Sequence, residues 1–161
     1  MFRESEKDRV NKLNTCLAKI LSGMKPPEDL TVSQWADKNR RLTSESSAEV
    51  GKWRTSRTPY MFDILDSFTD PLIEHIVVVA ASQVGKSETI NNMVGYCIDQ
   101  DPGPILLIQP TIDDVKRYSE MRIAPMIRET RCLKRKVADP KSRDAANTKR
   151  QKSFPGGVLV M

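Results

Sequence analysis

Apolar runs and amphipathic stretches alternate along this chain and predict an α/β protein. Residues 76–79 and 105–108 are continuous apolar runs, the pattern of strands buried on both faces of a parallel sheet. Between them, residues 88–100 carry apolar side chains at spacings of three and four, which predicts a helix with one buried face. The order strand, helix, strand indicates a βαβ unit with a right-handed crossover. The side chains expected on the buried face of the helix are Ile90, Met93, Val94, Cys97 and Ile98.

Two helices are predicted within the first 42 residues. Residues 4–22 have the apolar spacing of an amphipathic helix, which can pack on its own domain or dock a partner. Residues 30–42 predict a second helix, which Thr31 or Ser33 can cap. Trp35 lies on the apolar face of that helix, where we expect it to anchor packing rather than to stack on a base.

Shorter elements are predicted on either side of the βαβ unit. A helix is expected at residues 60–68, and another at 112–121 with Thr111 and Asp114 in the positions of a near capping box. Residues 123–127 contain a proline and are expected to break or redirect that helix. Residues 158–161 predict a further strand.

The turn between the first strand and the long helix carries the candidate chemistry. Residues 80–87 read Ala-Ala-Ser-Gln-Val-Gly-Lys-Ser, which matches a phosphate-binding loop except that Ala80 replaces the first glycine. Alanine disfavours positive φ, so the match is relaxed. Backbone N–H groups can surround phosphate oxygens, Lys86 can reach the β- and γ-phosphates, and the Ser87 hydroxyl can ligate Mg²⁺. The alternative is an ordinary strand–turn–helix with an exposed lysine. The candidate phosphate-binding residues are Ser82, Gln83, Val84, Gly85, Lys86 and Ser87.

Basic and aromatic residues interleave at positions 51–60, upstream of this loop. An aromatic side chain such as Tyr60 can stack on adenine in that position. A loop that packs on the sheet edge is the alternative.

The positive charge of the chain is local. The net charge is +5, and residues 128–152 hold ten Lys/Arg and three Asp/Glu, a net of 10 − 3 = +7, which leaves 5 − 7 = −2 for the rest. Such a segment is either a solvated, partly disordered loop or a contact for a nucleic-acid backbone.

The three cysteines are far apart and contain no C-x-x-C pair. Their odd number predicts free, buried thiols in a reducing compartment. No apolar run has the length of a membrane span.

The acidic motif of a working ATPase is missing from the sequence. That motif is an apolar strand that ends in Asp, usually followed by Glu, whereas the run at 105–108 ends in Gln109. A similar pattern ends at Asp99, but it lies in the helix that follows the phosphate loop. The sequence therefore contains the phosphate-loop motif of the N-terminal part of an ATPase without the acidic motif. We expect negligible ATP turnover from this chain alone.

Several segments, taken together and in order, resemble the large terminase subunit of tailed phages, in the lambda-type GpA family. They are collinear over about residues 30–161, and in this order they are specific. The segments are Val32-Ser33-Gln34-Trp35-Ala36-Asp37 with Arg40 and Leu42, Gly51-Lys52-Trp53-Arg54 through Pro59-Tyr60, Ser82-Gln83-Val84-Gly85-Lys86-Ser87, Asp101-Pro102-Gly103-Pro104, Gln109-Pro110-Thr111, Ala124-Pro125 and Phe154-Pro155-Gly156-Gly157.

The resemblance implies a fold and a motor function. It implies an incomplete P-loop NTPase, a parallel sheet with flanking helices, at residues 30–161, preceded at 1–29 by an amphipathic helix and linker. It also implies an ATP-driven, Mg²⁺-dependent motor that moves double-stranded DNA into a procapsid. The implied partners are double-stranded DNA, a small terminase subunit and the portal of the procapsid.

The resemblance carries over to few residues. Gly85, Lys86 and Ser87 correspond to the phosphate loop, and Tyr60 lies where the family's adenine-binding segment falls. Gln109-Pro110-Thr111 is similar to a helicase-like motif that couples ATP state to DNA grip. Some large terminases carry an arginine in the loop, where this chain has Ser82 and Gln83.

Two other interpretations stay open at this point. The chain can be a catalytically inactive prophage remnant that binds nucleotide weakly at most. It can also be a helicase-like P-loop ATPase, although the collinear segments argue against that class. The family's acidic motif, coupling motif and nuclease domain would all lie after Met161.

Overall fold

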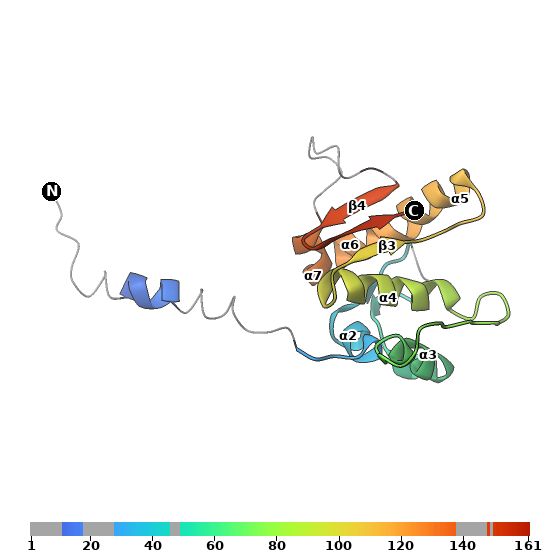
Figure 1. Ribbon diagram of the computed structural model, residues 1–161, viewed down its shortest axis with the longest axis horizontal. Coiled ribbons are helices and arrows are strands. Elements are labelled where there is room, and N and C mark those ends of the chain that lie inside the picture. Colours follow the sequence, from blue (N-terminus) through green and yellow to red (C-terminus); the bar gives the residue numbers. More distant parts are fainter. Residues whose placement is uncertain (1–10, 18–27, 46–48, 138–147, 149) are drawn as a thin grey trace.

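A computed structural model describes residues 11–17, 28–45, 49–137, 148 and 150–161 of the chain (Figure 1). Residues 11–17 are helical and exposed, with Leu13 63% and Leu17 48% accessible. They lie within the helix predicted at 4–22, whose remaining positions fall outside the described residues. No helix in these ranges is long and apolar enough to cross a membrane.

A small mixed sheet forms one layer of the fold. It contains β3 (Pro104–Leu106), β4 (Gln151–Phe154) and β5 (Gly157–Val160) in the order β3-β5-β4. β3 and β5 are parallel, whereas β4 and β5 form an antiparallel hairpin whose turn contains Gly156 at φ 86°. A second pair, β1 (Arg41–Leu42) with β2 (Gly51–Lys52), is antiparallel. The protein is thus α/β, with a sheet that is mixed rather than parallel.

Helices pack on the sheet and on one another. The long helix α4 (Lys86–Asp99) lies between the sheet and the helices α2 (Val32–Asn39) and α3 (Phe62–Ser67), as Figure 1 shows. The 3₁₀ turns η1 (Thr55–Arg57) and η2 (Pro59–Met61) lead into α3. The buried core residues are Trp35, Ala36, Trp53, Val94, Ile98, Ile123, Met126, Leu133, Val137, Phe154 and Leu159.

Local sequence signals placed several elements correctly. α2 begins after Thr31, whose hydroxyl accepts from the Gln34 N–H while the Gln34 side chain accepts from the Thr31 N–H. Trp35 is fully buried, so it anchors packing as expected. The helix α5 (Ile112–Tyr118) begins after Thr111, whose hydroxyl accepts from the Asp114 N–H. β5 agrees with the strand expected at 158–161.

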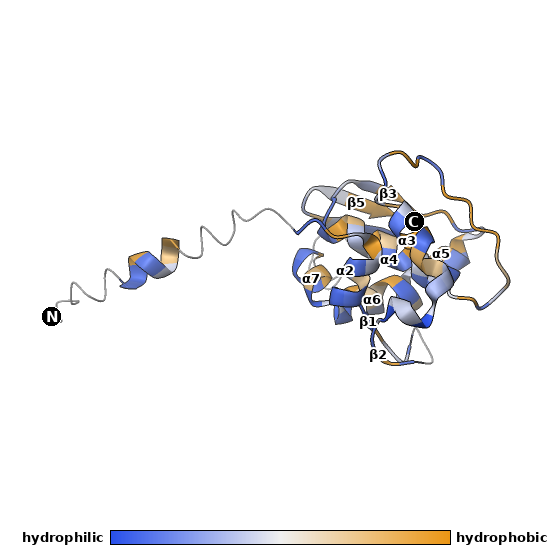
Figure 2. Cartoon of the chain, turned by 90° about the horizontal axis from the view of Figure 1, so that it is seen from below, coloured by the Kyte–Doolittle hydropathy of each residue, from blue (hydrophilic) through white to orange (hydrophobic). Residues whose placement is uncertain are grey.

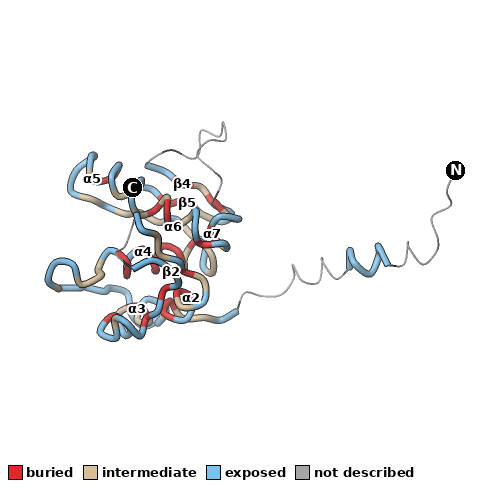
Figure 3. The backbone as a smooth tube through the Cα atoms, turned by 180° about the vertical axis from the view of Figure 1, so that it is seen from behind, coloured by how far each residue is buried: buried red, intermediate tan, exposed pale blue. Residues whose placement is uncertain are grey.

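The first predicted strand is wrong. Residues 73–80 have no regular secondary structure, and Val77 and Val79 are 86% and 95% accessible. Figure 2 shows a hydrophobic stretch of loop along the outside of the fold, and Figure 3 shows an exposed loop that projects beside α4. An apolar run gives strand propensity, but a strand also needs a neighbour for its backbone hydrogen bonds. β3, β4 and β5 pair with one another, and none of them pairs with 73–80.

The predicted βαβ unit is therefore not formed between 76–79 and β3. β3 ends at Leu106, so it is shorter than the run predicted at 105–108. That run is also less buried than expected, since Leu106 and Ile108 are 69% and 78% accessible. Helix α4 buries Val94 and Ile98 as predicted, but Ile90 is 41% accessible. Residues 76–79, which were expected to form a strand, are an open loop.

The region after α5 is more regular than its sequence indicated. A π-helical turn, η3 (Ser119–Ile123), joins α5 to α6 (Ala124–Glu129), and α7 (Arg131–Lys136) follows. Pro125 does not break this run because it lies at the start of α6, where its missing N–H is tolerated. Residues 128–137 and 150–152 are thus ordered, whereas the rest of the predicted charged loop lies outside the described residues apart from Thr148. The thiols at positions 16, 97 and 132 are free, but Cys16 is exposed rather than buried.

Candidate phosphate-binding site

The predicted phosphate loop forms a turn that ends at the start of α4. Gly85 is the residue before the helix, at φ 92°, and no side chain caps the helix there. The free N–H groups of the first helical turn are therefore available to a ligand. In the described ranges, Gln83 is the non-glycine residue with positive φ, at 60°. The left-handed conformation falls on Gln83, so alanine at position 80 is compatible with the turn.

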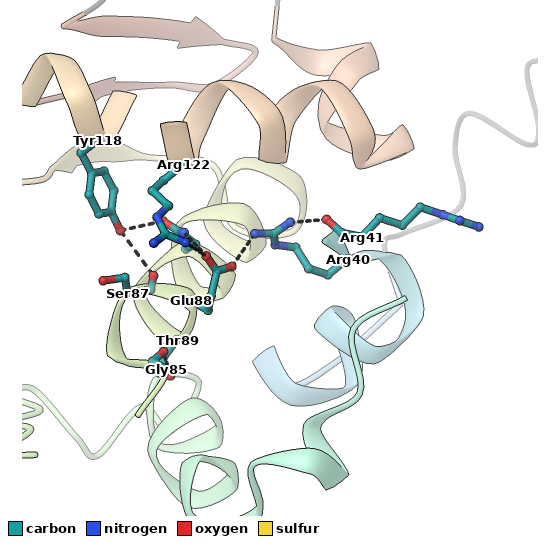
Figure 4. A network of polar contacts seen from close by, with 9 residues as sticks. Arg40, Arg41, Gly85, Ser87, Glu88, Thr89, Tyr118 and Arg122 are labelled. Carbon is teal, nitrogen blue, oxygen red and sulfur yellow. Dashed lines mark hydrogen bonds and ion pairs between the residues drawn. The ribbon is translucent and has the colours of Figure 1, made fainter. Parts of the chain in front are cut away.

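The lysine of the loop folds back over its own backbone. Lys86 Nζ donates to the carbonyl oxygen of Ala80 at 2.7 Å and of Ala81 at 3.0 Å. Its positive charge is thereby held against the backbone carbonyl groups at the start of the loop. Ser87 is exposed in the first turn, and its side chain points away from the Glu88 carboxylate (Figure 4). Lys86 and Ser87 therefore both belong to the first turn of α4, directly after Gly85.

Tyr60 lies against the same loop. Its hydroxyl donates to the carbonyl oxygen of Val84 at 3.2 Å, and its side chain is 58% accessible. A cavity of about 210 Å³ opens beside it. Its lining combines cations with the loop backbone: Leu42, Glu49, Lys52, Trp53, Arg54, Arg57, Thr58, Tyr60, Gln83, Val84, Gly85 and Glu88.

A larger, mainly apolar cavity of about 500 Å³ has Lys86 in its lining. It separates the exposed segment 73–78 from α4. It is lined by Met61, Ile64, Phe68, Ile73, Glu74, Ile76, Val78, Lys86, Thr89, Ile90 and Met93.

A buried polar network surrounds the residue after Ser87, and the sequence patterns did not reveal it (Figure 4). Glu88 Oε2 accepts from Arg40 Nη2 at 2.7 Å, and Glu88 Oε1 lies 3.3 Å from Arg122 Nη1. The Tyr118 hydroxyl donates to Asn91 Oδ1 at 2.7 Å and lies 3.3 Å from the Ser87 carbonyl oxygen. The partners of Glu88 are 48 and 34 positions away in the sequence, so no local motif could identify them.

Burial sets the ionisation of this network. Burial lowers the pKa of the Arg40 guanidinium, and the neighbouring Glu88 carboxylate opposes that shift. Burial, together with the charge of Glu88, raises the pKa of Tyr118 to about 12. Arg40 stays charged at neutral pH because its ordinary pKa is far above 7, and the Tyr118 phenol stays protonated as a donor.

The family described as phage terminase large subunit gpA, ATPase domain, matches residues 47–161. The chain belongs to this family. ATPase domains as a class bind nucleotide, and the uncapped start of α4 is compatible with such a ligand.

Two curated relatives are similar to the chain over most of its length. The large terminase subunit of Escherichia phage lambda is 28% identical over 121 residues, 75% of this chain and 19% of that protein. The large terminase subunit of Enterobacteria phage P21 is 27% identical over 132 residues, 82% of this chain and 20% of that protein. The chain thus spans about a fifth of the length of these terminase relatives. No solved structure matches it.

Proposed function

We propose that this chain is the nucleotide-binding part of a DNA-packaging motor that ATP drives. The observation that carries the proposal is the meeting of Gly85, Lys86 and Ser87 at the uncapped start of α4. That arrangement supports a P-loop NTPase fold for residues 30–161, with 1–29 as a separate N-terminal segment. The membership of the terminase ATPase family supports the same function.

The residues present fit Mg²⁺-ATP. The N–H groups at the start of α4 and in the turn from Ser82 to Val84 would surround the phosphate oxygens. Lys86 would exchange its two loop carbonyl partners for the β- and γ-phosphates, and the Ser87 hydroxyl would ligate Mg²⁺. Bound Mg²⁺ would supply charge neutralisation for phosphoryl transfer.

The 210 Å³ cavity is the site we assign to the base and ribose. Tyr60 forms one wall, and its exposed ring can stack on adenine. Arg54 and Arg57 line the same cavity, and Arg57 is paired with Glu49. Arg54 is therefore our candidate for the cation that a loop arginine supplies in some large terminases.

The partners of the proposed motor follow from its relatives. The names of those relatives identify them as terminase large subunits. We extend this to double-stranded DNA, a small terminase subunit and the portal of a procapsid, in the cytoplasm of a host cell. The exposed cations of α7, Arg131, Lys134 and Arg135, support a contact with DNA phosphates.

A binding-only function is the second candidate. It is favoured by the end of β3, since the chain continues from that strand into Gln109 and not into a carboxylate that could hold Mg²⁺ or polarise water. A remnant that binds ATP and turns over none of it would have this property.

Titration with a fluorescent ATP analogue, with and without Mg²⁺, tests the proposal. Lys86→Ala should weaken binding by at least about tenfold, because one charge-assisted contact is worth about 1.5–3 kcal/mol. Ser87→Ala should remove the Mg²⁺ dependence and leave the metal-free affinity unchanged. Lys116→Ala is the matched control, since Lys116 is an exposed lysine paired with Asp113 on α5. Equal affinity of the wild type and Lys86→Ala would contradict the assignment of the loop.

A further inference from the structure

Glu88 places a carboxylate beside the proposed phosphate site. It follows Ser87 directly and lies in the first turn of α4, where free N–H groups favour anions. A carboxylate that faced the loop would repel phosphate through its like charge. In the structure Glu88 is buried and points away from the side chain of Ser87 (Figure 4).

Two guanidinium groups hold Glu88 in this position. The side chain of Arg40 is 1% accessible and that of Arg122 is 38% accessible, so the first is part of the core and the second reaches solvent. The two cations and the one carboxylate sum to 2 − 1 = +1. The acid nearest the phosphate loop is therefore neutralised, and a net positive charge remains at the start of α4.

The same turn of α4 is held by Tyr118, one turn before Arg122. Tyr118 contacts the Ser87 carbonyl oxygen and Asn91, while Arg122 contacts Glu88. Both residues belong to the helical run of α5 and η3. η3 is a π-helical turn, a local widening that is often found at functional sites. One surface of this run thus fixes the backbone and the acidic side chain at the phosphate loop.

We propose that Arg122 and Tyr118 are positioning residues for the nucleotide. Arg122 keeps the Glu88 carboxylate away from the phosphates, and Tyr118 holds the first turn of α4 in the orientation in which its N–H groups face the ligand. This inference rests on the proposed nucleotide binding. It adds the statement that the affinity of the loop depends on a helix outside it. Arg40 serves mainly the core, because it is fully buried.

A double-mutant cycle between Arg122 and Glu88 tests the inference. Arg122→Met keeps the aliphatic part of the side chain and leaves the Glu88 charge with one partner. It should weaken binding of the ATP analogue about tenfold, because the net charge of the cluster beside the anionic ligand falls from +1 to 0. Glu88→Gln in the same chain should restore most of that affinity, because the repelling charge is gone. A purely structural role of Arg122 would give no such rescue.

Further variants separate position from charge. Arg122→Lys should bind within about threefold of the wild type, since the positive charge is kept. Tyr118→Phe should weaken binding and leave its Mg²⁺ dependence intact. Arg128→Met is the control, because Arg128 is an exposed arginine of α6 that pairs with Glu129 and Glu45. Thermal melts of every variant show which of them are folded.

The outcomes distinguish this inference from the proposed function. If the wild type binds the ATP analogue and Arg122→Met binds it equally well, the inference is overturned and the proposed function stands. Loss of binding in Arg122→Met that Glu88→Gln does not restore also overturns it. If the wild type binds no nucleotide, the proposed function and this inference fall together.

Discussion

Gly95 decides how closely α2 and α4 approach. A Cβ atom built on Gly95 would lie 2.4 and 2.9 Å from two ring atoms of Trp35, which is fully buried. The missing side chain thus makes the space for the indole, whose Nε1 donates to Asp99 Oδ2 at 2.8 Å. One glycine in the middle of a helix thus makes room for one of the two tryptophans of the core.

Gly95→Ala should lower the free energy of unfolding. Overpacking of a buried site costs about 1–3 kcal/mol, and the better helix propensity of alanine returns up to about 1 kcal/mol, so the net loss is on the order of 1–2 kcal/mol. Chemical denaturation measures it. Gly103→Ala is the control, because a Cβ there meets no atom within 4 Å. A gain in stability for Gly95→Ala would show that Trp35 can move aside.

Some residue roles were readable from the sequence because their chemistry is local. Thr31 and Thr111 cap helices through atoms three residues away, and Lys86 and Ser87 belong to a contiguous motif. Arg40 was not readable in this way. The chain folds Arg40 into the core against Glu88, 48 positions away, and no local pattern names that partner.

Asp99 connects three elements at the C-terminal end of α4. It accepts from Trp35 Nε1 of α2 at 2.8 Å and pairs with Lys136 Nζ of α7 at 2.9 Å, while Gln100 also donates to it. Burial acts to raise its pKa, but these hydrogen bonds and the charge of Lys136 outweigh burial, so the pKa of Asp99 lies below its ordinary value.

Asp99→Asn should lower the free energy of unfolding at neutral pH and make that free energy less dependent on pH in the acidic range. A lowered folded-state pKa means that the charged form stabilises the fold above the unfolded-state pKa. That contribution is lost as pH falls through the lower folded-state value. We expect the free energy of unfolding to fall by about 1–2 kcal/mol at pH 7. The substitution removes the charge-assisted contact with Lys136, whereas the asparagine amide oxygen can still accept from Trp35 Nε1.

Denaturation curves at several pH values check this. The difference between the wild type and Asp99→Asn should shrink below the ordinary pKa of aspartate. Asp113→Asn is the control, because Asp113 is an exposed acid paired only with Lys116 on the same helix. A difference that stays constant from pH 7 to pH 2 would mean that the charge of Asp99 contributes nothing.

At the scale of elements, helices were more predictable than strands. The positions of α2, α3, α4 and α5 follow from periodicity and caps, which act within a few residues. Residues 76–79 have the composition of a buried strand, yet strand formation depends on a partner that sequence pattern alone does not name. β4 was not predicted, because its sequence lacks the apolar pattern of a strand although it has a pairing partner in β5. It is a polar strand, Gln151–Phe154, that forms because the Gly156 turn aligns it with β5.

At the scale of the whole molecule, exposed positive charge gathers on the short helix α7 among the residues that the structure describes. Arg131, Lys134 and Arg135 of α7 are exposed and share one face by their spacing of three and four. Within the described ranges, none of the three forms an ion pair, whereas Lys116 and Arg117 of α5 pair with acids of their own helix. Cations without an acidic partner contribute more to the free energy of binding an external anion than cations that are already paired. We therefore expect α7 to be the surface that contacts DNA phosphates.

Replacing Arg131, Lys134 and Arg135 together with glutamine should weaken binding to double-stranded DNA whatever its sequence. Each phosphate contact releases counterions and adds about 0.9 to the slope of log affinity against log salt, so the slope should fall by about 2–3. Fluorescence anisotropy at several salt concentrations measures it. A variant with Lys38, Lys116 and Arg117 changed to glutamine has the same net charge, and its three lost cations all had acidic partners. If both variants lose the same slope, net charge rather than α7 determines binding, and the DNA surface must lie elsewhere.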